Sequence, residues 1–591
     1  KLFKSNRYLE VCIDKNSPKR GRGLYSKADK TIKPGFTILS LAPHVAVLDT
    51  NLLSTRCSSC FLESQDFDDS SSHQIRRCTK CKVIAYCGEN CQRLDWISHK
   101  LECKALVNYA QLAQSVTKAN QKSKSRLGSI GNFTQSNSTS TIGNNPDNDY
   151  QICTVPSSSV RAMARLIWNK SREEKKDPNW WNGLEELHSQ WNACNQAQKE
   201  KLMGLSMTLS RYIGAQILIE AISSASSLLP FCSRFLDNSF TLTSPTLDNI
   251  GVVLSGSAAF INHSCSPNAV VIFPEGGEGA SKKSGKEWVK VIALKDIEPG
   301  DEILTSYVDL SVTRKERQKD LAQRMQFICD CELCVKSERD PSFVDPRDAL
   351  KCPKCTNWFS LDSGPSSSSM STTTSSSLNT RSSFGTNSKN AKKEIKCPDC
   401  GFSRLIDIEG QRLAIKKSGL NLDPHKEPEK AAYYAEKAIE WLELKLLPFR
   451  FGVGFYPILN LRRLKMISKL ICHSENDRED EDQLISGVHL IYGFGHPISI
   501  ITKSTITKWL ERLGSEEESQ RRLEEERRNL ESSLKMLRCI KEEYQLKSFK
   551  ECLIGFGSIN NGGRLGRYMN QCMVETEREI DTLKQKLRSI S

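Results

Sequence analysis

The spacing of apolar and polar positions changes several times along the chain, and each change predicts a different kind of segment. Near the start, the turn Lys33-Pro34-Gly35 leads into the apolar run 36–41. Much later, the runs 269–273 and 288–292 have the same short, β-branched character. Short apolar runs bounded by glycine and proline are typical of strands joined by turns. We therefore expect two strand-rich segments, 7–50 and 238–310.

Two other stretches place apolar residues three and four apart, which puts them on one face of a helix. Within segment 159–237 these positions are Leu202, Leu205, Leu209, Tyr212, Ile213, Ile217, Ile219 and Ile222. Within segment 425–591 they are Ala431, Ala435, Ala438, Ile439, Leu442 and Leu446, followed by Pro448. We expect one core-facing helix over 202–222, and a helical C-terminal region whose first helix ends before the proline.

The last part of the chain is highly charged, with Leu523, Leu530, Leu537 and Tyr544 recurring every seven residues. This spacing allows a coiled-coil seam, but Arg527 at an intermediate seam position equally allows a solvated helix packed on a neighbour. Segments 115–150 and 360–393 are rich in serine, threonine, asparagine and glycine. Such compositions cannot bury enough apolar surface to fold, so we expect both segments to be disordered.

The 591 residues are enough for roughly four domains. Lysine plus arginine total 84 against 70 acidic residues, a formal charge of +14 that is compatible with acidic partners without identifying one. No apolar run reaches the ~18 residues that a membrane helix needs, and residues 1–10 are too charged for a signal peptide. We expect no membrane association and no secretion, with cytoplasmic and nuclear localisation as the default.

Cysteine spacing is the strongest chemical signal among the 23 cysteines of the chain. The first cluster contains eight potential ligands: Cys57, Cys60, Cys78, Cys81, Cys87, Cys91, His99 and Cys103. Thiolates and imidazole bind zinc, and a closed structural site takes four of them. Eight ligands therefore predict two structural zinc sites. The alternative, a set of buried core cysteines, does not account for the paired CxxC spacing.

Two further clusters follow. Cys329, Cys331 and Cys334 leave a zinc site one ligand short, so Cys265 is the candidate for the fourth; a three-cysteine loop without metal is the alternative. Cys352-x2-Cys355 and Cys397-x2-Cys400 form the two knuckles of a zinc ribbon spanning 350–402. The long loop 360–393 between the knuckles is tolerable, because each doubling of loop length costs only about 0.6 kcal/mol.

The run 86–103, YCGENCQRLDWISHKLEC, closely resembles a MYND zinc finger. This resemblance implies that the two sites of finger 57–103 interleave. One ion would be held by Cys57, Cys60, Cys87 and Cys91, and the other by Cys78, Cys81, His99 and Cys103. It also implies that the finger is a docking module for protein partners, not a catalytic centre.

Three separated motifs, Arg20-Gly21-Arg22-Gly23-Leu24, Asn262-His263-Ser264-Cys265 and Gly300-Asp301-Glu302-Ile303-Leu304-Thr305-Ser306-Tyr307, together with the three-cysteine tail, resemble the SET domain of protein lysine methyltransferases. With a MYND finger inside it, the chain resembles the SET-and-MYND (SMYD-type) family. The resemblance implies an α+β fold whose β-rich SET domain is divided between 7–50 and 238–310. Its other parts would be the MYND finger, the disordered insert, a helical insert 159–237, a post-SET zinc segment 311–337, the ribbon, and the α-helical C-terminal region.

The resemblance also assigns roles to individual residues. S-adenosylmethionine would be bound by Arg20, Gly21, Arg22, Gly23, Asn238, Asn262, His263, Tyr307 and Phe327, and Tyr307 would be the catalytic tyrosine. Zinc ligands would be the two finger sets, the post-SET set Cys265, Cys329, Cys331 and Cys334, and the ribbon set Cys352, Cys355, Cys397 and Cys400. Met325 stands where the family usually has a second channel tyrosine, which puts the methylation degree and efficiency in doubt.

The expected reaction is methyl transfer to a lysine of a histone or another protein. The alternative is a catalytically weak adaptor that binds protein partners through its finger and C-terminal helices. A nucleic-acid role is disfavoured, because no base-reading helix is evident. The charged stretch 314–317 is expected to be a solvated helix face and not a nucleic-acid site.

Overall fold

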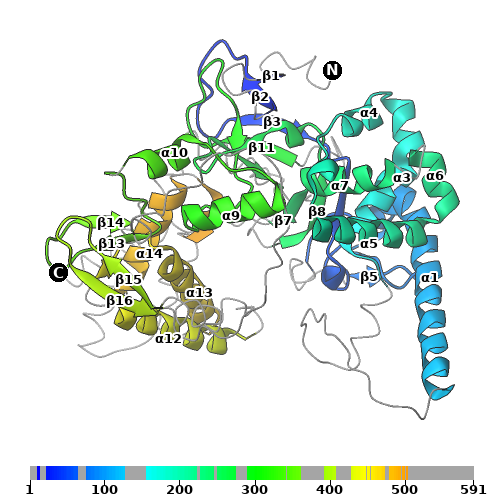
Figure 1. The fold of residues 1–591 in the computed structure, drawn as a ribbon. Coiled ribbons are helices and arrows are strands. Elements are labelled where there is room, and N and C mark those ends of the chain that lie inside the picture. Colours follow the sequence, from blue (N-terminus) through cyan, green and yellow to red (C-terminus); the bar gives the residue numbers. More distant parts are fainter. Residues whose placement is uncertain are drawn as a thin grey trace, which may run out of the picture. The chain divides into compact units, whose positions relative to one another are not determined.

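The computed structural model describes residues 9–13, 21–63, 75–126, 155–222, 227–244, 249–273, 289–340, 342–360, 392–407, 427–446, 449–452, 454–472, 478–493, 496–499 and 501–502 (Figure 1). These residues fall into two compact units. The first unit comprises the described residues up to Asn262 together with 268–305. The second unit comprises 263–267 and the described residues from Ser306 onward.

Short antiparallel sheets form the frame of the first unit. One sheet has the order β10-β11-β3 and another the order β4-β8-β7, while β1 pairs with β2 and β5 with β6. The strands are β1 (Leu9–Ile13), β2 (Arg22–Ser26), β3 (Thr37–Leu41), β4 (Val45–Leu48), β5 (Arg76–Arg77), β6 (Ala85–Tyr86), β7 (Phe240–Thr243), β8 (Asn249–Leu254), β9 (Asn262–His263), β10 (Ala269–Ile272), β11 (Val289–Ala293) and β12 (Leu304–Thr305). Strands β3, β10 and β11 therefore form where the apolar runs predicted them.

Helix α3 packs against strands β4 and β8, and α5 packs on α3, so that both helices contribute to the main core of this unit (Figure 1). The helices of the unit are α1 (Glu89–Arg126), α3 (Ser158–Lys176), α4 (Trp180–Glu185), α5 (Gln196–Ile213), α6 (Ala215–Ile222) and α7 (Leu228–Asn238), with 3-10 turns at Thr50–Leu52, Trp191–Ala193 and Ala258–Phe260. The buried face of α3 runs from Val160 to Ile167 without a gap, because helices and sheet enclose it.

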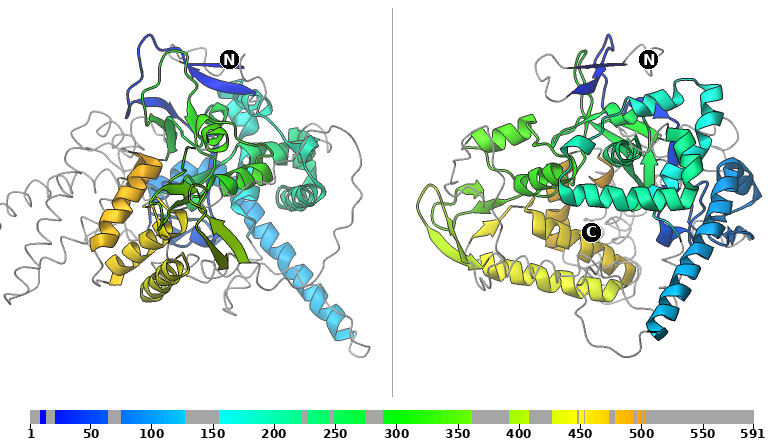
Figure 2. Two further views of the ribbon diagram at one scale, coloured as in Figure 1. Left: turned by 60° about the vertical axis from the view of Figure 1, so that its left-hand side comes forward. Right: turned by 45° about the vertical axis from the view of Figure 1, so that its right-hand side comes forward.

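Two sequence predictions for this unit were wrong in part. The single helix expected over 202–222 is two helices, α5 and α6, because Gly214 between them has φ +96°, a left-handed conformation that ends α5. As a result Ile217 is exposed instead of facing the core. In addition, α1 continues through Arg126, so 115–126 are helical and not disordered; the rest of segment 115–150 lies outside the described residues. Figure 2 shows α1 as a long rod.

The second unit combines a small three-stranded sheet, a two-stranded hairpin and α-helices. The sheet has the order β14-β13-β17, and β15 pairs with β16. The elements are α9 (Arg314–Arg324), α10 (Glu332–Arg339), β13 (Ala349–Lys351), β14 (Trp358–Ser360), β15 (Lys392–Lys396), β16 (Ser403–Asp407), α12 (Pro428–Leu446), β17 (Arg450–Phe451), α13 (Tyr456–Cys472) and α14 (Arg478–Tyr492). The predicted face of α12 is buried at Ala431, Ala435 and Leu442 and packs against α13 (Figure 2).

The predicted disordered loop 360–393 is wrong at its ends, because Ser360 belongs to β14 and Lys392 and Lys393 belong to β15. Segments 361–391 and 503–591 lie outside the described residues, so the predictions of disorder and of heptad helices there remain predictions. Among the described helices, no single one is long and apolar enough to cross a membrane. The pair α5 and α6 together has sufficient length and apolar composition, but the two helices are bent at 111° to each other.

His44, between β3 and β4, links α4 to the sheet. Its ring lies 5.2 Å from that of Trp180, and its Nδ1 accepts a hydrogen bond of 3.2 Å from the Gly256 backbone N–H. Burial lowers the pKa of His44 from 6.5 to about 4, although a hydrogen bond with the Trp180 backbone and the charge of Asp177 act in the opposite direction.

The lowered pKa predicts a specific loss of stability in weak acid. The unfolded chain binds the His44 proton below about pH 6.5 and the folded chain does not, so this stability is present above pH 6.5 and is lost as the pH falls toward 4. Between pH 7.5 and 5.5 the free energy of unfolding should fall by about 1 kcal/mol more in wild type than in His44→Asn, which keeps an acceptor but cannot titrate. Urea unfolding at the two pH values measures this; parallel losses in both proteins would contradict it.

Candidate active site and metal centres

The first finger site lies where the loop after Leu53 meets the start of α1. Cys57, Cys60, Cys87 and Cys91 bring their sulfur atoms within 4.8 Å of one another. The Cys60 and Cys87 sulfurs are 3.6 Å apart, and those of Cys87 and Cys91 are 3.4 Å apart. Hydrogen bonding with Cys60 lowers the pKa of the Cys57 thiol far below its usual range. Four thiols that compete for protons at this distance form the environment in which a divalent cation replaces those protons.

The second finger site combines Cys78, Cys81, His99 and Cys103, again within 4.8 Å. The Cys78 and Cys103 sulfurs are 3.8 Å apart, and His99 directs Nε2 to within 3.7 Å of the Cys81 sulfur. The eight ligands are thus grouped as the MYND resemblance implied. One set has four cysteines and the other has three cysteines and a histidine, and both suit tetrahedral zinc. Because all four coordination positions are taken by the protein, no position remains for a substrate.

A buried charge network orients the histidine of the second site. His99 Nδ1 lies 3.2 Å from Glu102 Oε2, and Glu102 is fully buried. Arg165 of α3 donates Nε to Glu102 at 3.1 Å and Nη1 to Asp95 at 2.7 Å. Burial alone would raise the pKa of Glu102, but the charges of Arg165 and Arg161 and the hydrogen bond with His99 lower it to about 2. Glu102 therefore stays ionised and keeps the ring proton of His99 on Nδ1, leaving Nε2 free to bind metal.

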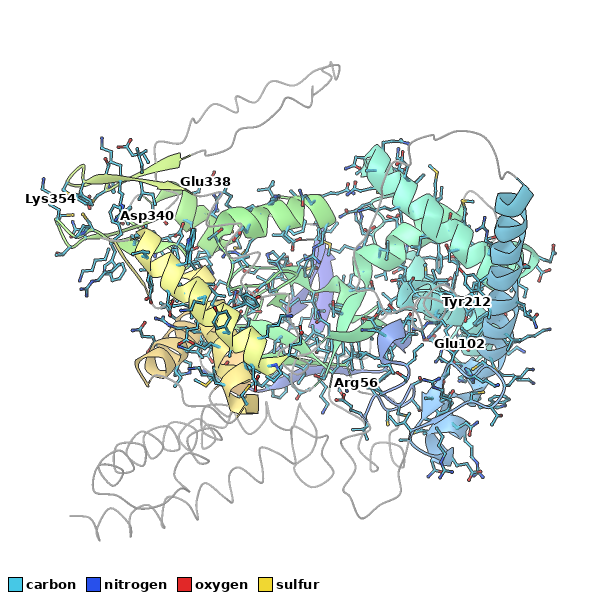
Figure 3. The ribbon with its side chains drawn as sticks, turned by 90° about the horizontal axis from the view of Figure 1, so that it is seen from below. Arg56, Glu102, Tyr212, Glu338, Asp340 and Lys354 are labelled. Carbon is cyan, nitrogen blue, oxygen red and sulfur yellow. The ribbon has the colours of Figure 1, made fainter. Side chains whose placement is uncertain are left out.

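Sequence reasoning missed Glu102 and Arg165. A glutamate three residues after a histidine on a helix is common, and α3 begins more than fifty residues beyond the finger. Tyr212 of α5 lies close to Glu102 in Figure 3, and burial raises the pKa of its hydroxyl well above 10. The finger is therefore joined to the helical insert through the same carboxylate that orients its histidine.

In the second unit, Cys265 joins Cys329, Cys331 and Cys334 within 4.8 Å, so it is the fourth member that the three-cysteine motif required. The Cys265 sulfur is 3.6 Å from that of Cys334 and 4.0 Å from that of Cys329. All four side chains are buried. A fourth cluster closes the ribbon, with the Cys352 and Cys400 sulfurs 3.5 Å apart and those of Cys355 and Cys397 3.6 Å apart. Both sets also fit zinc.

Arg317 of α9 is fully buried beside the Cys265 cluster, so the expectation that stretch 314–317 is a solvated face is wrong at this residue, although Lys315 and Glu316 are exposed. Burial would lower the pKa of Arg317, but the charge of Cys265 and that of Asp345, 3.5 Å away, raise it. A zinc ion with four thiolates carries a net charge of about −2, so a fixed cation next to it offsets a charge that would otherwise be costly to bury.

The first unit holds the side-chain amide of Asn262 in place. Its Nδ2 donates to Glu302 Oε1 at 2.8 Å and to the Arg22 carbonyl at 3.2 Å. Glu302 lies directly over Gly23, where a Cβ would stand only 2.2 Å from Oε1. Position 23 therefore requires glycine for the close approach of Glu302, a residue that sequence reasoning did not single out. The Glu302 carboxylate thus links Asn262 to Gly23, and the Asn262 amide in turn contacts the Arg22 carbonyl.

The remaining predicted cofactor residues of this unit behave differently. Arg22 is paired with Glu186, and its guanidinium lies 5.1 Å from the Phe260 ring centroid. Gly21 has φ +76°, and Arg20 lies outside the described residues. Asn238, at the end of α7, donates its amide hydrogens to the His188 and Arg234 carbonyls at 2.8 and 2.7 Å. The side-chain oxygen Oδ1 of Asn238 is therefore the part of its amide that could contact a ligand.

The second unit brings His263, Tyr307 and Phe327 together. The Tyr307 backbone N–H donates to His263 Nδ1 at 3.0 Å, and the two rings are 5.4 Å apart. Since Nδ1 accepts, the ring proton of a neutral His263 stands on Nε2, which lies 3.3 Å from the Cys265 sulfur. The Phe327 ring is 6.1 Å from that of His263. Met325 packs with Tyr307 against the Cys265 cluster.

Parts of this chain are similar in sequence to known proteins. The SET domain family matches residues 21–308. An N-lysine methyltransferase SMYD2-A of Danio rerio is 27% identical over 342 residues, which cover 57% of this chain and 63% of the relative. The histone-lysine N-methyltransferase SMYD3 of Homo sapiens is 25% identical over 327 residues, covering 55% and 62%. The human N-lysine methyltransferase SMYD2 is 24% identical over 339 residues, covering 57% and 63%.

Residues 21–308 therefore match the SET domain family, within a chain that combines strands, helices and several clusters that fit zinc. Over the aligned residues the chain is similar to methyltransferases of the SET-and-MYND (SMYD) type, the family that the sequence resembles. The chain spans just over three fifths of the length of the curated relatives that it matches.

The Glu102–His99 pair makes a testable prediction about metal affinity. Glu102→Gln removes the charge that orients His99 and leaves Arg165 underpaired, so the second finger site should lose zinc about 10- to 100-fold more readily. Competition with a chromogenic chelator measures the change. Glu89→Gln, on the exposed start of the same helix and paired only with Arg93, is the matched control and should behave as wild type. Equal zinc release by all three proteins would contradict the assignment.

Proposed function

We propose that the chain is an S-adenosylmethionine-dependent protein-lysine N-methyltransferase. One observation carries the proposal: the 3.0 Å hydrogen bond from the Tyr307 backbone to His263 fixes the expected catalytic tyrosine beside the expected cofactor-binding histidine. The SET domain match over residues 21–308 and the names of the SMYD relatives support the same reaction.

The residues present suit the cofactor. Asn262 and His263, with the backbone at Gly21 to Gly23 and the carbonyl oxygen of Asn238, would hold its polar parts, and Phe327 would pack on its adenine. The cofactor supplies a methyl group on a sulfonium sulfur, and the methyl–sulfur bond breaks as the methyl–nitrogen bond forms. The main task of the protein is therefore alignment, which can contribute roughly 7–11 kcal/mol.

The incoming lysine must be neutral to act as a nucleophile, although its free pKa is ~10.4. Apolar surroundings such as Met325 and Phe327 disfavour the charged ammonium and so lower that pKa. The Tyr307 hydroxyl would orient the amine and stabilise the charge that develops on it. Methionine at position 325 gives this channel one hydroxyl fewer than the usual family pattern.

The Cys265 cluster would support cofactor binding indirectly. Cys265 lies two residues after His263, and Cys329 lies two residues after Phe327, so one zinc ion would fix two walls of the binding site to each other. The metal would act as a structural clip with no part in methyl transfer.

We further propose a protein as substrate, with histones and other lysine-bearing proteins as candidates, in the cytoplasm and the nucleus. The finger would dock protein partners through Leu94, Ile97 and Leu101, which share an exposed face of α1. The alternative, an adaptor with little activity, is favoured only by Met325.

Cys331→Ser should weaken S-adenosylmethionine binding at least about tenfold, because the clip between the His263 and Phe327 segments is lost. Isothermal titration calorimetry measures the affinity, and zinc content should fall by one ion per chain while the finger keeps its two. Cys472→Ser, on α13 and outside every cluster, is the control. Unchanged cofactor affinity in Cys331→Ser would refute the clip while leaving the methyltransferase proposal intact.

Tyr307→Phe should reduce methyl transfer about 10²- to 10³-fold, since it removes a hydroxyl that acts on developing charge. Radiolabel transfer from S-adenosylmethionine to mixed histones and cell lysate measures it. Tyr433→Phe, on the exposed face of α12, is the matched control and should keep full activity. Label from wild type that is lost only with Tyr307→Phe supports the enzyme, and absence of label from every protein supports the adaptor.

A further inference from the structure

The proposed methyl transfer makes no use of the zinc ribbon, defined here as residues 349–360 and 392–407 with β17 beside them. Its sheet β14-β13-β17 has two unlike faces. On the inner face Leu350 and Phe359 are buried, in the core that α12 and α13 also form. Phe451 is paired with Leu350 and packs against the same core. The inner face therefore holds the ribbon on the helices, and the outer face is left to be explained.

Three side chains form a row across the outer face. Lys351 of the central strand pairs with Trp358 on one side and with Arg450 on the other. Residues directly opposite each other in an antiparallel sheet project from the same face, so an indole stands in line with two cations. Trp358 is 45% exposed, and Lys351 Nζ lies 5.8 Å from its ring centroid. Within the described part of the chain, neither Lys351 nor Arg450 has an ion-pair partner.

The indole is held along the surface of the sheet and does not stand away from it. A Cβ added at Gly452, just after β17, would lie 3.6 Å from the indole Cζ3 atom and 3.5 Å from the Ala349 Cβ. The ring of Trp358 therefore reaches from β14 across β13 toward the far edge of the sheet. The side chain is nevertheless 45% exposed, and a base could stack on the ring if the flexible Lys351 side chain, whose Nζ lies over the ring at 5.8 Å from its centroid, turns toward a phosphate.

The charge around this row is positive. The ribbon and residues 449–452 contain seven lysine and arginine residues against three acidic ones. A zinc ion with four thiolates subtracts about two charges, and the zinc-loaded ribbon still carries a positive excess. Lys354, Lys396 and Arg404 are exposed, and Figure 3 places Lys354 at the outer edge of the ribbon strands. Of the acidic groups, Asp399 is held by Asn357 at 3.3 Å and Glu394 is exposed.

We propose that this outer face binds single-stranded nucleic acid, with one base stacked on Trp358 and with phosphates neutralised by Lys351 and Arg450. An exposed indole at one end of a row that continues with two cations matches the combination of stacking platform and basic track that single strands use. An acidic polypeptide would satisfy the cations but has no flat ring for the indole. Stacking is tolerant of base identity, so this mode needs no base-reading helix, the feature whose absence disfavoured nucleic acid at the level of sequence.

The stacking part of the proposal is tested with fluorescein-labelled 12-nucleotide oligo-dT and oligo-U, titrated with the full-length, zinc-loaded protein and read by fluorescence anisotropy. Trp358→Ala should weaken binding about 5- to 150-fold, the range found for base–aromatic stacking, and Trp358→Phe should restore part of it. Tyr433→Ala, which removes another exposed aromatic ring of the same unit, should bind as wild type. Zinc content and circular dichroism verify that each variant is folded.

The electrostatic part is tested by salt dependence. The double variant Lys351→Gln, Arg450→Gln should reduce the slope of log affinity against log salt by about 1.4, because about 0.7 is lost per phosphate contact on a single strand. Lys437→Gln, an exposed lysine on α12 paired with Glu440, is the control and should keep the wild-type slope.

Several outcomes would overturn the proposal: no binding by wild type, binding that Trp358→Ala leaves unchanged, or equal displacement by polyglutamate. The last would identify an acidic polypeptide as the occupant. Methyl transfer is measured on the same variants, and Trp358→Ala should retain it, so failure of the nucleic-acid proposal remains distinguishable from failure of the proposed enzyme activity.

Discussion

Four groups of ligand atoms, each drawn within 4.8 Å, impose the constraint on which the local structure of this chain depends. Thiolates at such distances repel one another, and neutral thiols gain little from the contact, so the arrangement is stable only with a cation at its centre. The surrounding elements are short: several strands have two or three residues, and segments rich in serine and asparagine interrupt the chain. Zinc bound at these clusters would therefore supply folding free energy in addition to that from burial.

Each metal site also creates a charge that its surroundings must accommodate, and the chain does so in two ways. With zinc bound, the four cysteines around Cys265 would carry a net negative charge, and the buried guanidinium of Arg317 lies beside them. The site that contains His99 is less negative and instead needs an oriented imidazole, which Glu102 supplies. Glu102 in turn requires Arg165, and through it the finger becomes part of the core that α3 and α5 build. The ion pair between Glu102 and Arg165 thus connects the metal site to the tertiary core.

The sequence was most informative where spacing alone determines the outcome. Paired cysteines fixed the finger and ribbon clusters, and the need for a fourth ligand was enough to single out Cys265. It was least informative where the outcome depends on register or on distant partners. The apolar spacing continues across Gly214, so the break between α5 and α6 could not be anticipated. Likewise, Arg317 looks like any surface arginine until α9 is placed beside the Cys265 cluster. The row of Trp358, Lys351 and Arg450 exists only because β17, nearly a hundred residues later, pairs with β13.

The division of the chain between residues 262 and 263 has a consequence for how such a protein can be rearranged. The polypeptide passes from the first unit to the second at that peptide bond, returns to the first unit after residue 267, and leaves it again after residue 305. Neither unit is a continuous stretch, so no single truncation or gene fusion can separate them intact. Both knuckles of the ribbon, in contrast, lie in the second unit. Recombination could therefore add or remove the ribbon without interrupting the chain between Asn262 and His263.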